Sequence, residues 1–144
     1  MIWVNSINNA IYTILSSDSV LVSSSVNVDL NELYNLDPNR APWIGIYNNN
    51  ISVDPRRCQV NQPWMSEFNF TIHVQEIRYD TDQQGGEKLN ELLTHTLTAI
   101  NSNRTLNDTV NIIKGFEINP FQLDIEREND LWGYEINILA ERLT

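Results

Sequence analysis

The stretch "EFNFTIHVQEIRY", residues 67 to 79, alternates apolar and polar side chains over most of its length. The apolar positions of one parity are Phe68, Phe70, Ile72 and Val74. Because successive side chains of a strand point to opposite faces, this pattern predicts a long strand with one face on a core. The other face, which carries His73, is expected to turn toward water or a partner.

The alternation breaks at Glu76, because Ile77 and Tyr79 fall on the opposite parity. Three arrangements explain such a break. The strand has a bulge at this point, it ends there, or both of its faces become buried.

Two helices are predicted from apolar stripes with spacings of three and four residues. The first stripe contains Ile7, Ala10, Ile11, Ile14 and Leu15, and the second contains Leu89, Leu92, Leu93, Leu97 and Ile100. Asp18 follows the first helix and is expected to cap a short turn through "SVLV". The segment "DTDQQGG", residues 80 to 86, is expected to be a loop that ends before the second helix begins.

Further strands complete the pattern. "SVNVDL" (25 to 30) is a possible short strand, and "WIGIY" (43 to 47) predicts a short buried strand that ends in a turn at "NNN". In the last third, residues 114 to 128 and 131 to 143 form two strands that should pair directly across a short turn. A change of parity at Pro120 predicts a bulge or kink there.

The expected order is therefore helix, strand, strand, helix, strand, strand, in a single domain spanning residues 1–144. Helices on one face of an antiparallel sheet define an α+β fold. The size and the 41% of hydrophobic residues agree with one globular core.

The charge of the chain is strongly acidic, with a formal value of −10. Such a balance argues against a protein that grips nucleic acid, which needs a basic surface. No Lys or Arg precedes Arg40, so the first quarter is expected to carry unrelieved negative charge. The N-terminal segment has neither a basic leader nor an unbroken apolar run, so no signal peptide, membrane span or membrane partner is expected.

Residues that could perform catalysis are few. Cys58 with His73 or His95 is the only combination that resembles a nucleophile and its base, and neither histidine has the local spacing of a metal site. We therefore expect no enzyme activity, catalytic residue, metal or cofactor. The alternative is a small enzyme or ligand-binding domain with a pocket between the sheet and the second helix, although the leucine stripe should fill that space.

The order of elements resembles that of the bacteriophage tail terminators, or tail completion (head–tail joining) proteins. The resemblance rests on "NAIYTILSSDSVLVSSSV", "RAPWIGIYNN", "EFNFTIHVQEI", "GGEKLNELLTHTLTAI" and "INPFQLDIERENDLWGYEINILAERL", which together span nearly the whole chain. It implies a structural protein of the virion tail or neck, assembled in the host cytoplasm.

The resemblance further implies a homo-oligomeric ring, usually a hexamer, that ends polymerisation of the tail tube. Its partners would be the tail tube protein and the head-completion or connector protein, and DNA would pass through the ring without specific binding. Another neck component of the same fold, such as a head-completion or sheath-end protein, is the alternative within this class.

Five residues are candidates for contact with another subunit or with the tube: Trp3, Arg56, Arg57, Ile77 and Tyr79. Trp3 precedes the first helix without an evident core partner, and aromatic anchors are favoured at interfaces. Arg56 and Arg57 are adjacent in a polar loop and are suited to bidentate contact with carboxylates of a neighbour. An ordinary solvated loop is the alternative for the two arginines.

Overall fold

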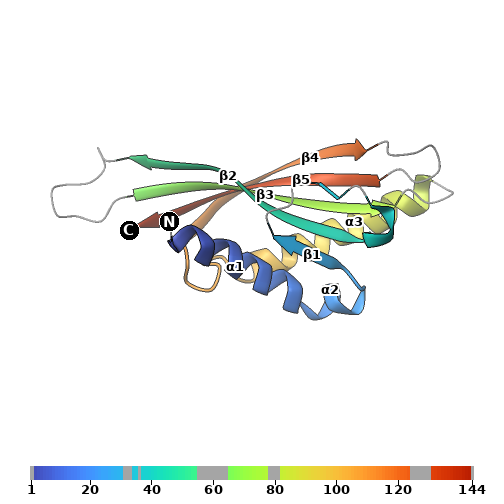
Figure 1. Ribbon diagram of the computed structural model, residues 1–144, viewed down its shortest axis with the longest axis horizontal. Helices are drawn as coiled ribbons and strands as arrows, with labels where there is room; N and C mark the ends of the chain where they lie inside the picture. The colour runs from blue at the N-terminus through green and yellow to red at the C-terminus, as the bar shows by residue number, and fades with distance from the viewer. Residues whose placement is uncertain are drawn as a thin grey trace.

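The computed structural model describes residues 2–30, 34–35, 37–54, 65–77, 82–123 and 131–143. These form a five-stranded sheet with three α-helices, which confirms the α+β class (Figure 1). In chain order the elements are α1 (Ile2–Ser17), α2 (Ser19–Ser23), β1 (Asn27–Leu30), the 3-10 helix η1 (Pro38–Arg40), β2 (Trp43–Asp54), β3 (Met65–Ile77), α3 (Asp82–Asn101), β4 (Ile112–Leu123) and β5 (Leu131–Leu143).

The sheet is mixed, and its strand order is β1-β2-β3-β5-β4. The pairs β2–β3, β3–β5 and β4–β5 are antiparallel, but β1 runs parallel to β2. The prediction of a wholly antiparallel sheet is therefore wrong at this edge. An alternating pattern records which face a side chain takes but not the direction of its strand, which depends on the connection.

Strand β3 is the centre of the sheet. It pairs with β2 on one side and with β5 along its whole length on the other. All four predicted core positions, from Phe68 to Val74, are 0% exposed. Burying each such side chain stabilises the fold by roughly 1.5–3 kcal/mol before the cost of ordering the chain.

The break at Glu76 marks a strand end and not a bulge. The register between β3 and β5 continues without a shift to the pair Ile77–Leu131, where β3 ends. Gln75 is 0% exposed and Glu76 is 5% exposed, although they point to opposite faces. Both faces of the sheet are therefore buried at this end.

Strand β2 does not stop at the asparagine run, as the sequence pattern predicted. It continues to Asp54, and the register against β3 shifts between Asn48 and Asn50. The irregularity accommodates an extra residue within the strand, while pairing with β3 supplies the backbone hydrogen bonds that a turn would have lost.

Helix α3 begins at Asp82 and includes the two glycines that were expected to lie in a loop. Glycine lowers helix stability by only about 1 kcal/mol per residue. Packing of the leucine stripe further along α3 is sufficient to offset this cost.

Strands β4 and β5 pair directly, as predicted, but the irregularity in β4 is not at Pro120. The register runs without a shift through the pair Pro120–Tyr134 and shifts instead between Ile113 and Gly115. Pro120 is tolerated because β4 lies at the edge of the sheet, where a missing N–H costs no interior hydrogen bond.

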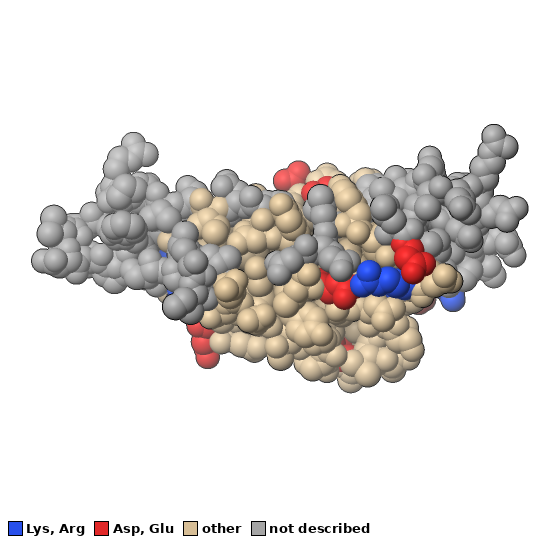
Figure 2. Space-filling model, in the orientation of Figure 1, with Lys and Arg blue, Asp and Glu red and all other residues tan. Residues whose placement is uncertain are grey.

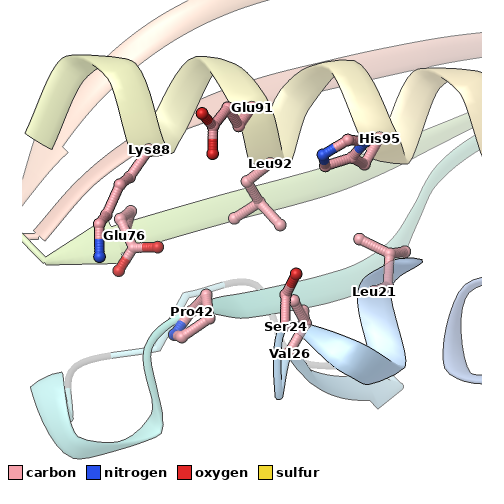
Figure 3. A pocket seen from close by; sticks show the side chains of 9 residues that line it. All are labelled: Leu21, Ser24, Val26, Pro42, Glu76, Lys88, Glu91, Leu92 and His95. Atoms are coloured by element: carbon pink, nitrogen blue, oxygen red, sulfur yellow. The ribbon is translucent and has the colours of Figure 1, made fainter. Parts of the chain in front are cut away.

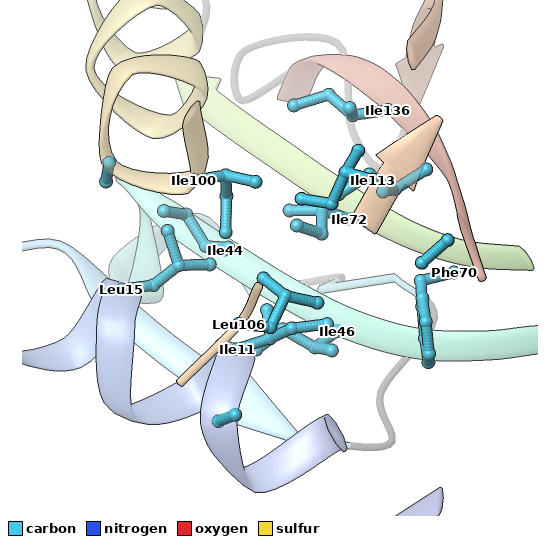
Figure 4. Packing of buried hydrophobic residues seen from close by; sticks show 14 of the residues in the cluster. Ile11, Leu15, Ile44, Ile46, Phe70, Ile72, Ile100, Leu106, Ile113 and Ile136 are labelled. Atoms are coloured by element: carbon cyan, nitrogen blue, oxygen red, sulfur yellow. The ribbon is translucent and has the colours of Figure 1, made fainter. Parts of the chain in front are cut away.

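The core lies between the helices and one face of the sheet (Figure 4). Both predicted helical stripes contribute to it, although Ile14, Leu93 and Leu97 are only partly buried. The connection between α3 and β4 adds Leu106, which is 0% exposed. Leu106, Asn107 and Asp108 all have positive φ, and this left-handed turn directs the leucine side chain into the core. Among the described residues, no helix is long and apolar enough to span a membrane.

Candidate functional site

The face of the sheet opposite the helices is covered at one end by the segment that precedes β2. We call it the covering segment, and residues 34–35 and 37–42 of it are described. The backbone N–H of Asn35 donates to Oε1 of Gln75 at 2.8 Å, and Nε2 of Gln75 donates to the carbonyl oxygen of Asn35 at 3.0 Å. Both residues are buried. This reciprocal pair holds the segment against β3, because separating it would leave two backbone groups without partners.

His73 lies under the same segment, so the expectation that it faces water is wrong. It is 0% exposed, and its ring packs edge-on against Tyr34 with centroids 4.8 Å apart. Desolvation lowers the pKa of His73 from 6.5 to about 4. The side chain is therefore neutral at neutral pH and belongs to the structural interior.

Asp29 on β1 joins the covering segment to the sheet edge. Its carboxylate pairs with the guanidinium of Arg40 and accepts a hydrogen bond from Nε1 of Trp43 at 2.6 Å. Arg40 is the first basic residue of the chain, and it neutralises one of the acids that precede it. The negative charge of the first quarter is therefore partly relieved.

The opposite end of this sheet face carries a charged cluster. Glu67 and Glu141 are directly opposed on β3 and β5, and Nζ of Lys114 lies 3.2 Å from a carboxylate oxygen of each. Hydrogen bonds to Glu67 and then Glu141 raise the pKa of Lys114. The lysine offsets the repulsion between two like charges on neighbouring strands.

A pocket of about 380 Å³ opens between α3 and the α2–β1 region (Figure 3). Leu21, Val26, Pro42 and Leu92 form its apolar lining, and Ser24, Glu76, Lys88, Glu91 and His95 supply polar groups. Lys88 and Glu76 point toward one another at one end of the pocket, and His95 lies at the other. The leucine stripe was expected to fill this space, but the pocket lies along its polar flank.

The volume of this pocket is within the range of ligand pockets. Its lining differs from theirs, because ligand pockets are lined predominantly by apolar side chains and here five of the nine lining residues are polar or charged. Within the part of the chain that the structure describes, no group of three or more His, Cys, Asp or Glu side chains could hold a metal ion.

A second, shallower groove of about 250 Å³ lies where α3 borders the outer strand β4. It is lined by Leu97, Thr98, Asn101, Phe116 and Ile118. Phe116 and Ile118 share the helix-side face of β4, yet they are 39% and 38% exposed because the helical layer does not extend over this edge. The sequence pattern showed their parity but not their position at the edge.

The five candidate contact residues are not brought together by the described part of the chain. Trp3 was expected to precede the first helix, but α1 begins at Ile2 and includes it. Ile77 is the last residue of β3, and the side chains of both residues lie outside the description. Arg56, Arg57 and Tyr79 lie outside the described residues altogether, as does Cys58. Their proposed contacts stay predictions.

Comparison with known protein families finds no family model that matches this sequence, and comparison with curated proteins finds no match either.

Proposed function

We propose that this chain is the structural subunit of a phage tail terminator, a ring that caps the tail tube, ends its polymerisation and joins it to the head or neck. The observation that carries the proposal is the edge strand β4, which has 12 residues and partly exposed Phe116 and Ile118. A long apolar edge promotes aggregation in a free monomer. In a closed ring the neighbouring copy covers it.

The charge of the chain supports the same proposal. A ring on the tail tube must let DNA pass, and a net charge of −10 repels phosphates instead of binding them. The proposed partners are identical copies of the chain, the tail tube protein and the head-completion or connector protein. The proposed location is the tail or neck of the virion, after assembly in the host cytoplasm.

Another neck component of the same fold, such as a head-completion or sheath-end protein, would have the same surface and charge. The two assignments differ only in which proteins the ring contacts. Binding of the purified protein to the open end of tail tubes supports the terminator, whereas exclusive binding to the connector supports a head-completion protein.

Electron microscopy of the purified protein, alone and with tail tube protein, tests the proposal. We expect annular particles with a central hole, and tubes of uniform length when both proteins are present. A protein that stays monomeric at high concentration, both alone and with the tube protein, contradicts it.

The pocket beside α3 favours a second candidate, a small ligand-binding domain or enzyme. His95 is the residue to replace, because it lines the pocket without being part of the core. The buried His73 is a poor choice, since its replacement disturbs packing. If His95→Leu leaves ring assembly unchanged, and a small-molecule screen finds no compound that raises the Tm of the unmodified protein, the second candidate fails.

A further inference from the structure

We infer that β4 of each copy pairs with the outer part of β2, residues 47 to 54, in the next copy, so that opposite edges of the sheet form the contact between subunits. The inference rests on the proposed ring and specifies its subunit interface. It follows from the free edges of the sheet, the directions of their strands and the distribution of charge.

The first free edge is β4. It is the last strand in the sheet order, and within the described residues no further strand pairs with it. The groove between β4 and α3 places Leu97, Phe116 and Ile118 beside this edge. A strand added here would gain backbone hydrogen bonds, and its side chains could enter the groove.

The second free edge is the outer part of β2. Strand β1 pairs only with Trp43 to Ile46, whereas β2 continues to Asp54. Residues 47 to 54 therefore have no neighbouring strand on that side in the described part of the chain. In Figure 1 this part of β2 extends past the helices together with β3.

The strand directions make these two edges complementary. Strand β2 is antiparallel to β3, and β4 runs in the same direction as β3 because both are antiparallel to β5. Placing the next copy beside β4 in the same orientation therefore sets its β2 antiparallel to β4. Antiparallel pairing would extend the sheet from copy to copy and is slightly more stable per residue than parallel pairing.

The register identifies residues that would meet. Tyr47 on β2 and Glu117 on β4 lie at the same level of the sheet, linked across it by the pairs Tyr47–Thr71, Thr71–Asn137 and Asn137–Glu117. They also share the face opposite the helices. Strand β1 lies beside Trp43 to Ile46 of β2, at the level of Ile118 to Phe121 of β4. A sheet continued without a shift of register therefore pairs residues 112 to 117 of one copy with the outer part of β2 in the following copy, and Glu117 lies next to Tyr47.

The helical layer permits close approach of two acidic copies. Helix α1 packs under β1 and β2, and none of its 16 residues is charged. Its exposed residues include Asn5, Asn9, Tyr12 and Thr13. Figure 2 shows a broad uncharged surface with charged residues in small groups. Interface cores are depleted of charge, and an uncharged helix avoids repulsion between copies.

A twofold contact between two β4 strands would also cover this edge, but it would leave the outer part of β2 open in both copies. The head-to-tail contact covers residues 112 to 117 of β4 and the outer part of β2 in every subunit once the ring closes. For this reason we assign the occupant of the β4 edge to β2 of a second copy.

Site-directed cross-linking tests the assignment. Glu117→Cys and Tyr47→Cys are made separately in a chain that also carries Cys58→Ser, so that each protein has one thiol. Both positions are exposed. The mixture of the two proteins is expected to form disulfide-linked dimers, and neither protein alone should do so. The control is Glu91→Cys, an exposed position on α3 that lies on neither edge.

We expect at least about tenfold more dimer from the mixture of Glu117→Cys and Tyr47→Cys than from either of them mixed with Glu91→Cys. The reason is that a shared contact raises the effective concentration of the two thiols. A chain carrying both edge substitutions should give a ladder of linked copies. A short bis-maleimide replaces oxidation if the register between copies is shifted.

Three outcomes would overturn the inference. Dimers from Glu117→Cys alone indicate the twofold contact. Annular particles that give no cross-link in the mixture indicate that the ring uses another surface, and the proposed function survives. A protein that is monomeric under all conditions removes both the interface and the ring.

Discussion

At the scale of single residues, the two ends of the sheet face away from the helices differ in burial, although the alternating pattern is the same along its length. One end is closed by a covering segment that holds Gln75 and His73 in the interior. The other end stays accessible and is organised by Lys114 between two carboxylates. The same strand face is thus a polar interior at one end and a charged surface at the other.

Gln75→Ala is expected to lower the free energy of unfolding by about 2–3 kcal/mol, because it leaves the buried N–H and C=O of Asn35 without partners. Chemical denaturation followed by circular dichroism measures the change. Asn119→Ala is the control, since it removes an exposed amide from β4 and should change stability by no more than about 0.5 kcal/mol. Equal effects of the two substitutions would contradict the role assigned to Gln75.

His73 makes stability depend on pH. Its pKa is about 4 in the folded protein against 6.5 for an ordinary histidine, so the unfolded chain binds more protons between these values. The free energy of unfolding should therefore fall as the pH decreases from 6.5 toward 4, by up to about 1.4 kcal/mol per pH unit from this group. Above this window the contribution is constant.

Denaturation of the unmodified protein and of His73→Gln at several pH values isolates this contribution. The carboxylates titrate in both proteins, so the difference between the two curves reports the histidine. We expect a shallower loss of stability in the variant. Parallel curves would mean that His73 is accessible to water.

At the scale of elements, α3 packs against the sheet with one face and lines a pocket and a groove with its flanks. Leu89, Leu92 and Ile100 are buried against the sheet, whereas Leu93 and Leu97 lie at the boundary of the core. The opposite flanks of the helix border the pocket and the groove beside β4. Positions that the apolar stripe treats as equivalent therefore differ in depth.

Aspartate substitutions at three consecutive positions of α3, which are buried, partly buried and exposed, test these differences in burial. Leu92→Asp puts a charge into the core and is expected to abolish soluble folding, a loss of more than about 4 kcal/mol. Leu93→Asp should destabilise less, because Leu93 is only partly buried. Thr94→Asp, at an exposed position, should stay within about 0.5 kcal/mol. Soluble yield and thermal unfolding measure the series, and a Leu93 variant more damaged than the Leu92 variant would contradict the orientation of the helix.

At the scale of the whole molecule, the proposed ring has to reconcile the acidic charge of the chain with contact between copies. A net charge of −10 opposes association of identical copies, so the proposed ring would require contact surfaces where charge is absent or complementary. The uncharged helix α1 meets the first condition. Arg56 and Arg57, two of the few basic residues, are predicted to meet the second.

Reversing both charges, with Arg56→Glu and Arg57→Glu, is expected to weaken assembly without changing the monomer fold. The physical reason is the loss of bidentate contacts to carboxylates of a neighbour and the added repulsion. Sedimentation and electron microscopy measure assembly, and circular dichroism checks the fold. Arg104→Glu, at an exposed position in the α3–β4 connection, is the matched control. Normal rings from the double variant would remove these arginines from the interface.

Periodicity was sufficient to predict β3 and the two helical stripes, and the short turn between the last two strands predicted their pairing. The residue type of Asp18 predicted a cap, and its carboxylate accepts hydrogen bonds from Val20 and Leu21. These features depend on near neighbours in the chain, which is why spacing records them. The strand through the asparagines and the helix through the glycines were missed, because pairing and packing overrode weak local preferences.

The sequence by itself determined which side chains form the apolar faces of the helices and strands, because each face follows from the spacing of apolar residues along its element. Only the tertiary structure decided that β1 is parallel, that His73 is covered and that β4 and the outer part of β2 are edges among the described strands. Strand direction, strand order and coverage by a distant segment depend on contacts between residues far apart in the chain, and no local pattern encodes them.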